Sequence, residues 1–154
     1  MRIKEINKWI DEGGSLPEEL TQKEKEHLTK LGGSAKEGWY GNGQKCYETN
    51  RLHEELHGKA IAWHPSGQKN YEYHYLRGEW HGKQENWWNN GQKKHERHYF
   101  HGKWHGKWRG WHTNGQKWYE ESYLHGVKHG VFKNWNEDGN LATDEEYLYG
   151  NKIK

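Results

Sequence analysis

Histidine is the residue with the clearest chemical potential in this sequence, because it recurs at a fixed interval. One histidine stands directly before a glycine in each of four successive 24-residue segments: His57, His81, His105 and His129. Imidazoles in register could bind a metal ion or titrate together as a pH switch. Zinc, however, needs nitrogens about 2 Å away, whereas equivalent positions of neighbouring hairpins lie about 10 Å apart. We therefore expect no metal site and favour histidines that hydrogen-bond in turns, with the pH switch as an alternative.

A carboxylate recurs with the same period. The acids are Glu48, Glu72, Glu96, Glu120 and Asp144. Two carboxylates about 5–9.5 Å apart can hydrolyse a glycosidic bond. Catalysis needs two groups in different environments, whereas a carboxylate in every repeat meets the same environment each time. The column therefore indicates cross-strand pairing. We expect no enzymatic activity and no catalytic residue, and a metal-dependent or carboxylate enzyme is the least favoured interpretation.

Tryptophan and tyrosine carry most of the apolar surface of this chain. The sequence has 11 Trp and 10 Tyr but only two Phe. Exposed aromatic side chains are favourable anchors in protein interfaces, and beside lysines they can also stack on the bases of single-stranded nucleic acid. The predicted partner-binding residues are Trp80, Trp87, Trp88, Trp104, Trp108, Trp111, Trp118, Lys83, Lys103 and Lys107. We expect a protein partner, with nucleic acid as the alternative, because the net charge is only +2.

Composition and cysteine usage bound the compartment. Cys46 is the single cysteine, so no disulfide can form within the chain, as is typical of a reducing compartment. The first ten residues are too charged for the apolar region of a signal peptide. No apolar run approaches the roughly 20 residues needed to span a bilayer. We therefore expect a cytoplasmic protein that does not insert into membranes and needs no cofactor.

The elements that must position these residues follow from the 24-residue period, which indicates stacked repeats. Each repeat places a Trp four residues before a glycine, beginning with Trp39 and Gly43. Asn-Gly and related pairs between strand-like runs are a strong hairpin signal and predict type I′ turns, with positive φ at both central residues. The sequence therefore predicts an all-β fold: a single-layer antiparallel meander of about five 24-residue hairpins over residues 34–154.

A second series of turns carries a glycine at Gly78, Gly102, Gly126 and Gly150. Glu54 occupies the corresponding position in the first hairpins, where positive φ is costly, so we expect irregular early repeats. Strand alternation predicts two columns on opposite faces. The tyrosine column is Tyr75, Tyr99, Tyr123 and Tyr147, and the other is Leu52, Leu76, Phe100, Leu124 and Leu148.

Residues 1–33 differ from the repeats and predict a helical N-terminal cap. Ile3, Ile6 and Ile10 are spaced as on one helix face, and glycines 13 and 14 end that helix. Ser15 and Pro17 indicate a helix start, and Thr21 with Glu24 forms a stronger capping box. Glycines 32 and 33 end that second helix. A separate partner-binding or dimerising element is the alternative interpretation of this segment.

Residues 123–139, with the sequence YLHGVKHGVFKNWNEDG, resemble the MORN repeat and, more closely, the MORN repeat variant. The resemblance covers roughly residues 34–154. It implies an open hairpin sheet that acts in binding or scaffolding, and it implies no reaction. Because the variant occurs in bacterial antitoxins, the resemblance implies an antitoxin-like module or small inhibitor that occupies the surface of a toxin or effector enzyme. Self-association through the sheet edges stays open as a second mode.

Overall fold

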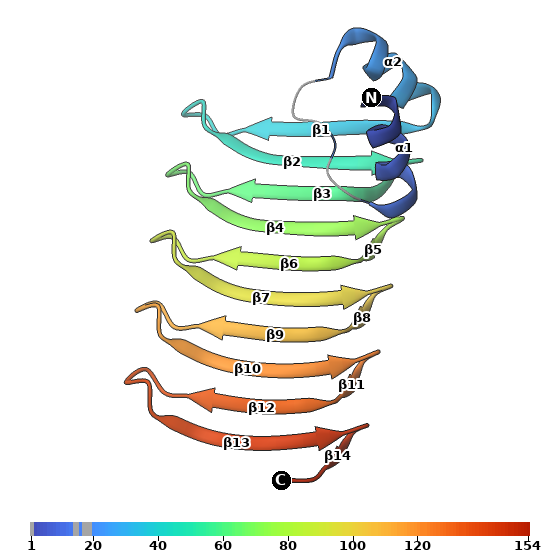
Figure 1. Ribbon diagram of the computed structural model, residues 1–154. Helices are drawn as coiled ribbons and strands as arrows, with labels where there is room; N and C mark the ends of the chain where they lie inside the picture. The colour runs from blue at the N-terminus through green and yellow to red at the C-terminus, as the bar shows by residue number, and fades with distance from the viewer. Residues whose placement is uncertain (1, 14–15, 17–19) are drawn as a thin grey trace.

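The chain forms one long, open antiparallel β-sheet with two short helices at its N-terminal end (Figure 1). This computed structural model describes residues 2–13, 16 and 20–154. Consecutive hairpins lie side by side in chain order, and the C-terminus lies at the far end of the sheet from the helices. The predicted all-β meander with a helical cap is confirmed.

The cap consists of α1 (Arg2–Glu12) and α2 (Gln22–Lys30). The predicted capping box is present, because the Glu24 amide donates to Thr21 Oγ1 (3.4 Å) and the Thr21 amide donates to Glu24 Oε2 (2.8 Å). Gly13 follows α1 with φ +67°, as a helix-ending glycine should. The helix start predicted at Ser15 and Pro17 lies outside the described residues.

The long strands of the described residues pair as five hairpins. They are β1 (Gly33–Trp39) with β2 (Lys45–Leu52), β3 (Glu55–Trp63) with β4 (Lys69–Leu76), β6 (Gly82–Trp87) with β7 (Lys93–Phe100), β9 (Gly106–Trp111) with β10 (Lys117–Leu124), and β12 (Gly130–Trp135) with β13 (Leu141–Leu148). Short strands pair with the ends of β4, β7, β10 and β13: β5 (Glu79–Trp80), β8 (Lys103–Trp104), β11 (Val127–Lys128) and β14 (Asn151–Lys152).

The Asn-Gly pairs lie in turns at one edge of the sheet, but these turns are not type I′. Gly43 has φ +84°, whereas Asn42 keeps a negative φ. The Gly43 amide donates to the Tyr40 carbonyl (2.9 Å), and the Gln44 amide donates to the Asn42 side-chain oxygen (3.0 Å). The asparagine therefore stabilises a longer loop through its side chain, and the type I′ prediction is wrong for these turns.

The type I′ backbone occurs instead in the turns at the opposite edge. Arg77 and Gly78 both have positive φ (+49° and +81°), and the same holds for the corresponding pairs in later repeats. Glu54 also adopts φ +67°, so this turn takes the common geometry although its residue is not glycine. The irregularity expected in the early repeats lies in the strands instead, because the register of β2 and β3 shifts between Thr49 and Arg51. Pairing of β2 with β3 holds this turn in the common geometry, and a non-glycine residue bears the conformational cost.

We predict that Glu54→Gly stabilises the protein. Glycine takes positive φ freely, so the substitution should remove a conformational cost of about 1 kcal/mol. The ion pair lost with Lys36 is long (3.9 Å) and exposed, so it offsets little of this gain. Thermal and urea unfolding of the full chain measure the change.

Gly78→Ala is the matched control at the same position of the next repeat. A Cβ there meets nothing closer than 3.9 Å, so any loss of stability reports the backbone conformation alone. An unfolding midpoint that Glu54→Gly leaves unchanged or lowers would contradict the strain at this turn.

Candidate binding surfaces

The two faces of the sheet differ in chemistry, as the alternation of side chains along a strand allows. One, which we call the aromatic face, carries a buried cluster of Tyr99, Trp108, Tyr119, Tyr123 and Phe132. Rings touch between successive hairpins, with Tyr99–Trp108 and Tyr123–Phe132 centroids 5.3 and 5.2 Å apart, and within one hairpin, with Trp108–Tyr123 centroids 5.2 Å apart. Indoles and phenols of neighbouring repeats thus bury one another in a single-layer sheet.

The predicted partner-binding residues do not form one patch. Trp108 belongs to the buried cluster of the aromatic face, and ring contacts with members of that cluster place three more tryptophans on the same face: Trp80, Trp104 and Trp118. The indole of Trp88 lies in a turn and donates to the Trp111 carbonyl (3.1 Å). Strand register and lysine contacts place the others on the opposite face: Trp87, Trp111, Lys83, Lys103 and Lys107.

Exposure divides the aromatic-face tryptophans further. Trp108 is only 7% exposed, and its indole donates to the His98 carbonyl (3.0 Å). Trp104 and Trp118 are 43% and 41% exposed. Trp104 packs on Trp108 from outside, with centroids 4.7 Å apart. Trp108 is therefore a packing residue, and Trp104 and Trp118 are the indoles of this face that a partner can reach.

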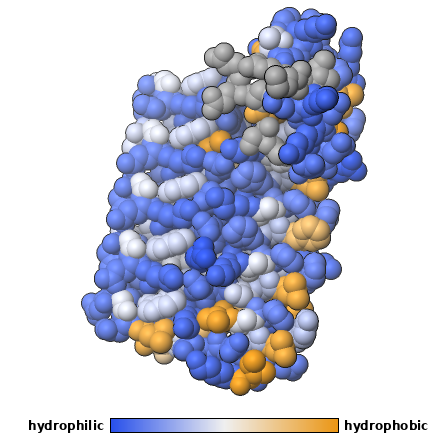
Figure 2. All heavy atoms as spheres, viewed as in Figure 1, coloured by the Kyte–Doolittle hydropathy of each residue, from blue (hydrophilic) through white to orange (hydrophobic). Residues whose placement is uncertain are grey.

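The opposite face, which we call the charged face, carries the acidic column within a network of ion pairs. Lys93 contacts both Glu85 (2.6 Å) and Glu96 (2.8 Å), while Arg109 bridges Glu96 (3.2 Å) to Glu120 (3.5 Å) in the next hairpin. The lysines that begin β2, β4, β7 and β10 also lie over the Trp of the following hairpin, for example Lys69 over Trp87 at 5.1 Å. Figure 2 shows this side of the sheet, where hydrophilic side chains predominate.

The network keeps the carboxylates ionised. Burial alone would raise the pKa of Glu72, but hydrogen bonds from Lys69 and Lys59 outweigh it and lower this pKa to about 2. The pKa values of Glu96 and Glu120 are lowered in the same way, against burial, first by Lys93 and Lys117 respectively. A general acid needs a raised pKa, so this column has the electrostatics of structural ion pairs.

The histidine column lies along the edge where the short strands turn. His57 Nδ1 accepts a hydrogen bond from the Arg77 amide of the next repeat (3.1 Å). The same contact recurs in the later repeats, where the amides of His101, His125 and Tyr149 donate to Nδ1 of His81, His105 and His129 respectively, at 3.3–3.4 Å. Each imidazole thus ties one repeat to the next, and the turn-bonding role predicted from the sequence describes these contacts.

Four of the repeats match a family model, the MORN repeat variant, at residues 56–76, 80–101, 104–125 and 128–149. The chain belongs to the MORN repeat variant family. No match was found among curated proteins. The first hairpin, β1–β2, lies outside the matched residues although it pairs in the same way. MORN repeats are non-catalytic modules that bind proteins or membranes, which agrees with the binding role expected from the resemblance.

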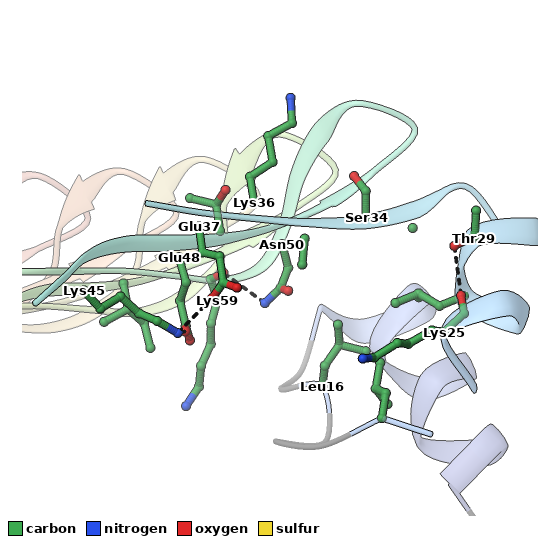
Figure 3. Close-up of a pocket in the computed structure, with 16 residues that line it drawn as sticks. Leu16, Lys25, Thr29, Ser34, Lys36, Glu37, Lys45, Glu48, Asn50 and Lys59 are labelled. Atoms are coloured by element: carbon green, nitrogen blue, oxygen red, sulfur yellow. Dashed lines mark hydrogen bonds and ion pairs between the residues drawn. The ribbon is translucent and has the colours of Figure 1, made fainter. Parts of the chain in front are cut away.

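A cleft of about 890 Å³ separates the cap from the first MORN-like hairpins (Figure 3). Leu16 and Lys25 line it from the cap, and Lys45, Glu48 and Lys59 line it from the charged face. Lys45 is already paired with Glu48 (3.0 Å) and Glu37 (2.9 Å). The positive charge that Lys45 brings to the cleft is therefore balanced by glutamates that line the same cleft.

The described residues contain no group of three or more His, Cys, Asp or Glu side chains placed to hold one metal ion. Neither described helix has the length and apolar character that crossing a bilayer requires.

Sequence reasoning missed two features of these surfaces. The column Phe100, Leu124 and Leu148 was predicted as a column on one face but not as exposed surface, although Phe100 and Leu148 are 44% and 47% exposed. The coupling of His95 to Tyr119 was also missed. Arg97 donates to the Tyr119 hydroxyl (3.2 Å), which in turn lies 3.1 Å from His95 Nδ1.

We predict that Trp108→Ala destabilises the protein far more than Trp104→Ala. Removing a buried indole leaves a cavity and costs about 3–5 kcal/mol, whereas the half-exposed Trp104 should cost about 1–2 kcal/mol. Urea unfolding monitored by circular dichroism gives both values. Equal losses would contradict the assignment of Trp108 to the core of the aromatic face.

We also predict that stability falls as the pH drops below about 6.5. Burial, with Arg97 and Lys94 nearby, lowers the pKa of His95 from 6.5 to about 4. Between these values the unfolded chain binds a proton that the folded protein does not, so acid favours unfolding and the penalty is absent above about pH 6.5. Burial lowers the pKa values of His57 and His81 too, in the same direction.

The urea midpoint measured from pH 8 to pH 4 tests this dependence, with His95→Asn as the comparison. Asn keeps an acceptor for Tyr119 but cannot titrate, so the slope of stability should decrease by up to about 1.4 kcal/mol per pH unit, the linkage of one proton. An unchanged slope would show that His95 titrates as it does in the unfolded chain.

Proposed function

We propose that this protein is a non-catalytic module that binds a partner protein through the aromatic face of its central repeats, and that it acts as an antitoxin-like or small inhibitor by occupying the partner's surface. The observation that carries the proposal is the exposure of Trp104 and Trp118 beside a buried aromatic cluster. Indoles fixed on a well-packed base lose little conformational freedom on binding, which favours them as interface anchors.

The charges support a protein partner over single-stranded nucleic acid. Lys69, Lys93 and Lys117 each form an ion pair with the glutamate three residues later in the same strand. The N–O distances are 2.7, 2.8 and 3.0 Å respectively. Lysines already paired with carboxylates contribute little to phosphate binding, which depends on free positive charge. Lys103 and Lys107 have no such partner among the described residues, but they lie on the face opposite Trp104 and Trp118, so they do not flank the exposed indoles. The proposal also places the protein in the cytoplasm, a reducing compartment, because Cys46 has no second cysteine to pair with.

Affinity capture with the full-length chain as bait, from the cells that produce it, tests the proposal. We expect a protein partner that stays bound after nuclease treatment and at about 0.5 M salt, because an aromatic interface depends weakly on salt. Trp104→Ala and Trp118→Ala should each weaken binding of the purified partner by about tenfold or more.

Trp39→Ala is the matched control, because this indole is also exposed but lies in the first hairpin, away from the central repeats. It should leave the affinity unchanged. Recovery of nucleic acid alone, lost steeply as salt rises, would replace the proposal with the single-strand alternative. A partner whose affinity is the same for all three variants would exclude the aromatic face.

A further inference from the structure

Helix α1 shows how a helix binds the charged face of this sheet. Ile6 and Trp9 share a buried cluster with Leu52 of β2, and Gly13 lies against Leu76 of β4. Ile6 and Gly13 are seven residues apart, and the two leucines are one repeat apart. Seven residues of helix rise about 10.5 Å, which matches the roughly 10 Å between hairpins. A helix that runs along the stacking direction, as α1 does in Figure 1, therefore meets each repeat with the same side of its surface.

The same column continues beyond the cap without a cover. Phe100, Leu124 and Leu148 occupy the positions of Leu52 and Leu76 in the next three repeats, and Val127 lies opposite Leu124 on β11. Leu52 is 4% exposed under the cap, whereas Phe100 is 44% exposed. Figure 2 shows hydrophobic side chains below the helices, toward the edge that carries the short strands. We call Phe100, Val127, Leu124 and Leu148 the apolar strip.

The histidine edge offers the same hydrogen-bond donor beside the strip as it offers α1. His57 Nε2 lies 2.6 Å from the Trp9 carbonyl, so its N–H donates to the last turn of α1 while Nδ1 accepts from Arg77. His81 and His105 use Nδ1 in the same way, which leaves the proton on Nε2. Within the described residues, these two Nε2 atoms have no hydrogen-bond acceptor. Both rings also contact Phe100, at centroid distances of 5.3 and 5.7 Å.

Positive charge flanks the strip. Lys103 lies directly opposite Phe100 in the β7–β8 pair, and Lys107 follows on β9. Among the described residues, neither lysine has an acidic group within 4.0 Å, unlike the lysines of the ion-pair network. An acidic segment beside the strip would complement both charges.

We propose that the apolar strip is a second docking surface, which receives an amphipathic helix of a partner protein with acidic residues beside its apolar side. This helix lies end to end with α1 along the stacking direction, and backbone carbonyls of its last turn accept from His81 or His105. Phe100 to Leu148 spans two repeat intervals, about 20 Å, so about 14 residues of helix cover it. The surface lies on the face opposite Trp104 and Trp118 and does not depend on the function proposed above.

A fluorescently labelled 18-residue peptide tests this inference with the full-length chain. The peptide places Leu, Ile and Trp at i, i+3, i+4 and i+7 on one side, with Glu on both flanks of that side, and a scrambled peptide of identical composition is its control. Fluorescence anisotropy should show binding of the amphipathic peptide at least about tenfold tighter than the scrambled one.

Variants locate the bound peptide. Phe100→Ala and Lys103→Glu should each weaken binding by about tenfold. Leu141→Ala removes an equally exposed apolar side chain outside the strip, and Lys23→Glu reverses an exposed lysine on α2; both should leave the affinity unchanged. Circular dichroism melting of every variant confirms that the fold is retained.

Three results would overturn the inference. They are no binding of the amphipathic peptide, equal binding of the scrambled peptide, and equal binding by Phe100→Ala and the wild-type chain. A dimer in sedimentation that Phe100→Ala dissociates would assign the strip to a second copy of this chain instead. The proposed function is tested separately. If binding of a captured partner is weakened by Trp104→Ala but persists when the peptide saturates the strip, the proposed function stands whether or not the peptide result supports this inference.

Discussion

Neighbouring hairpins of this protein are joined by backbone pairing of adjacent strands and by hydrogen bonds between side chains of one repeat and the backbone of the next. At one edge the Arg77 amide donates to His57, and at the other the Asn42 amide group donates to the Pro65 carbonyl (3.1 Å). Between these edges, rings on the aromatic face and ion pairs on the charged face join the same neighbours. A single-layer sheet has no second layer to pack against, so side chains that reach the next repeat take over that role.

The stacking constraint also explains why the two faces serve different purposes. Aromatic rings of neighbouring repeats bury one another, so Tyr99 and Trp108 are nearly covered while Trp104, which contacts Trp108, stays 43% exposed. On the charged face every repeat supplies both a carboxylate and a cation, so the charges neutralise one another along the array. The surface available to partners therefore consists of side chains that are not buried between repeats: the indoles outside the buried aromatic cluster, and the apolar strip beyond the helical cap.

The repeat period and strand alternation predict the strands and the columns, because both are properties of the chain itself. The cap follows instead from helical spacing and helix-ending glycines in residues 1–33. The Thr21 capping box followed from two residues at a fixed spacing. Burial could not be predicted in this way. Trp104 and Trp108 are both tryptophans, and both rings contact Tyr123. Trp108 additionally packs on Tyr99 and donates its indole N–H to the His98 carbonyl, contacts that the sequence pattern does not reveal.

Closeness in sequence is a poor guide to which candidate tryptophans share a surface, because strand alternation already assigns some of them to different faces. Trp108 and Trp111 are three residues apart on β9, so they point to opposite faces, which the strand pattern already implies. Trp118 needed the structure, because the register of β9 and β10 shifts between Lys117 and Tyr119 and places Trp118 beside Tyr119. The roles of His57 and Glu54 likewise depend on a turn geometry that tertiary pairing imposes.

The central claim is that a preformed array binds a partner protein through side chains of its central repeats. Hydrogen–deuterium exchange of the full chain, free and with its captured protein partner, tests this most directly. We expect a protected sheet in the free protein and additional slowing of exchange on binding that is confined to residues 80–128. Exchange that slows throughout residues 33–154 on binding, or only around the cleft beside Leu16 and Lys25, would contradict it.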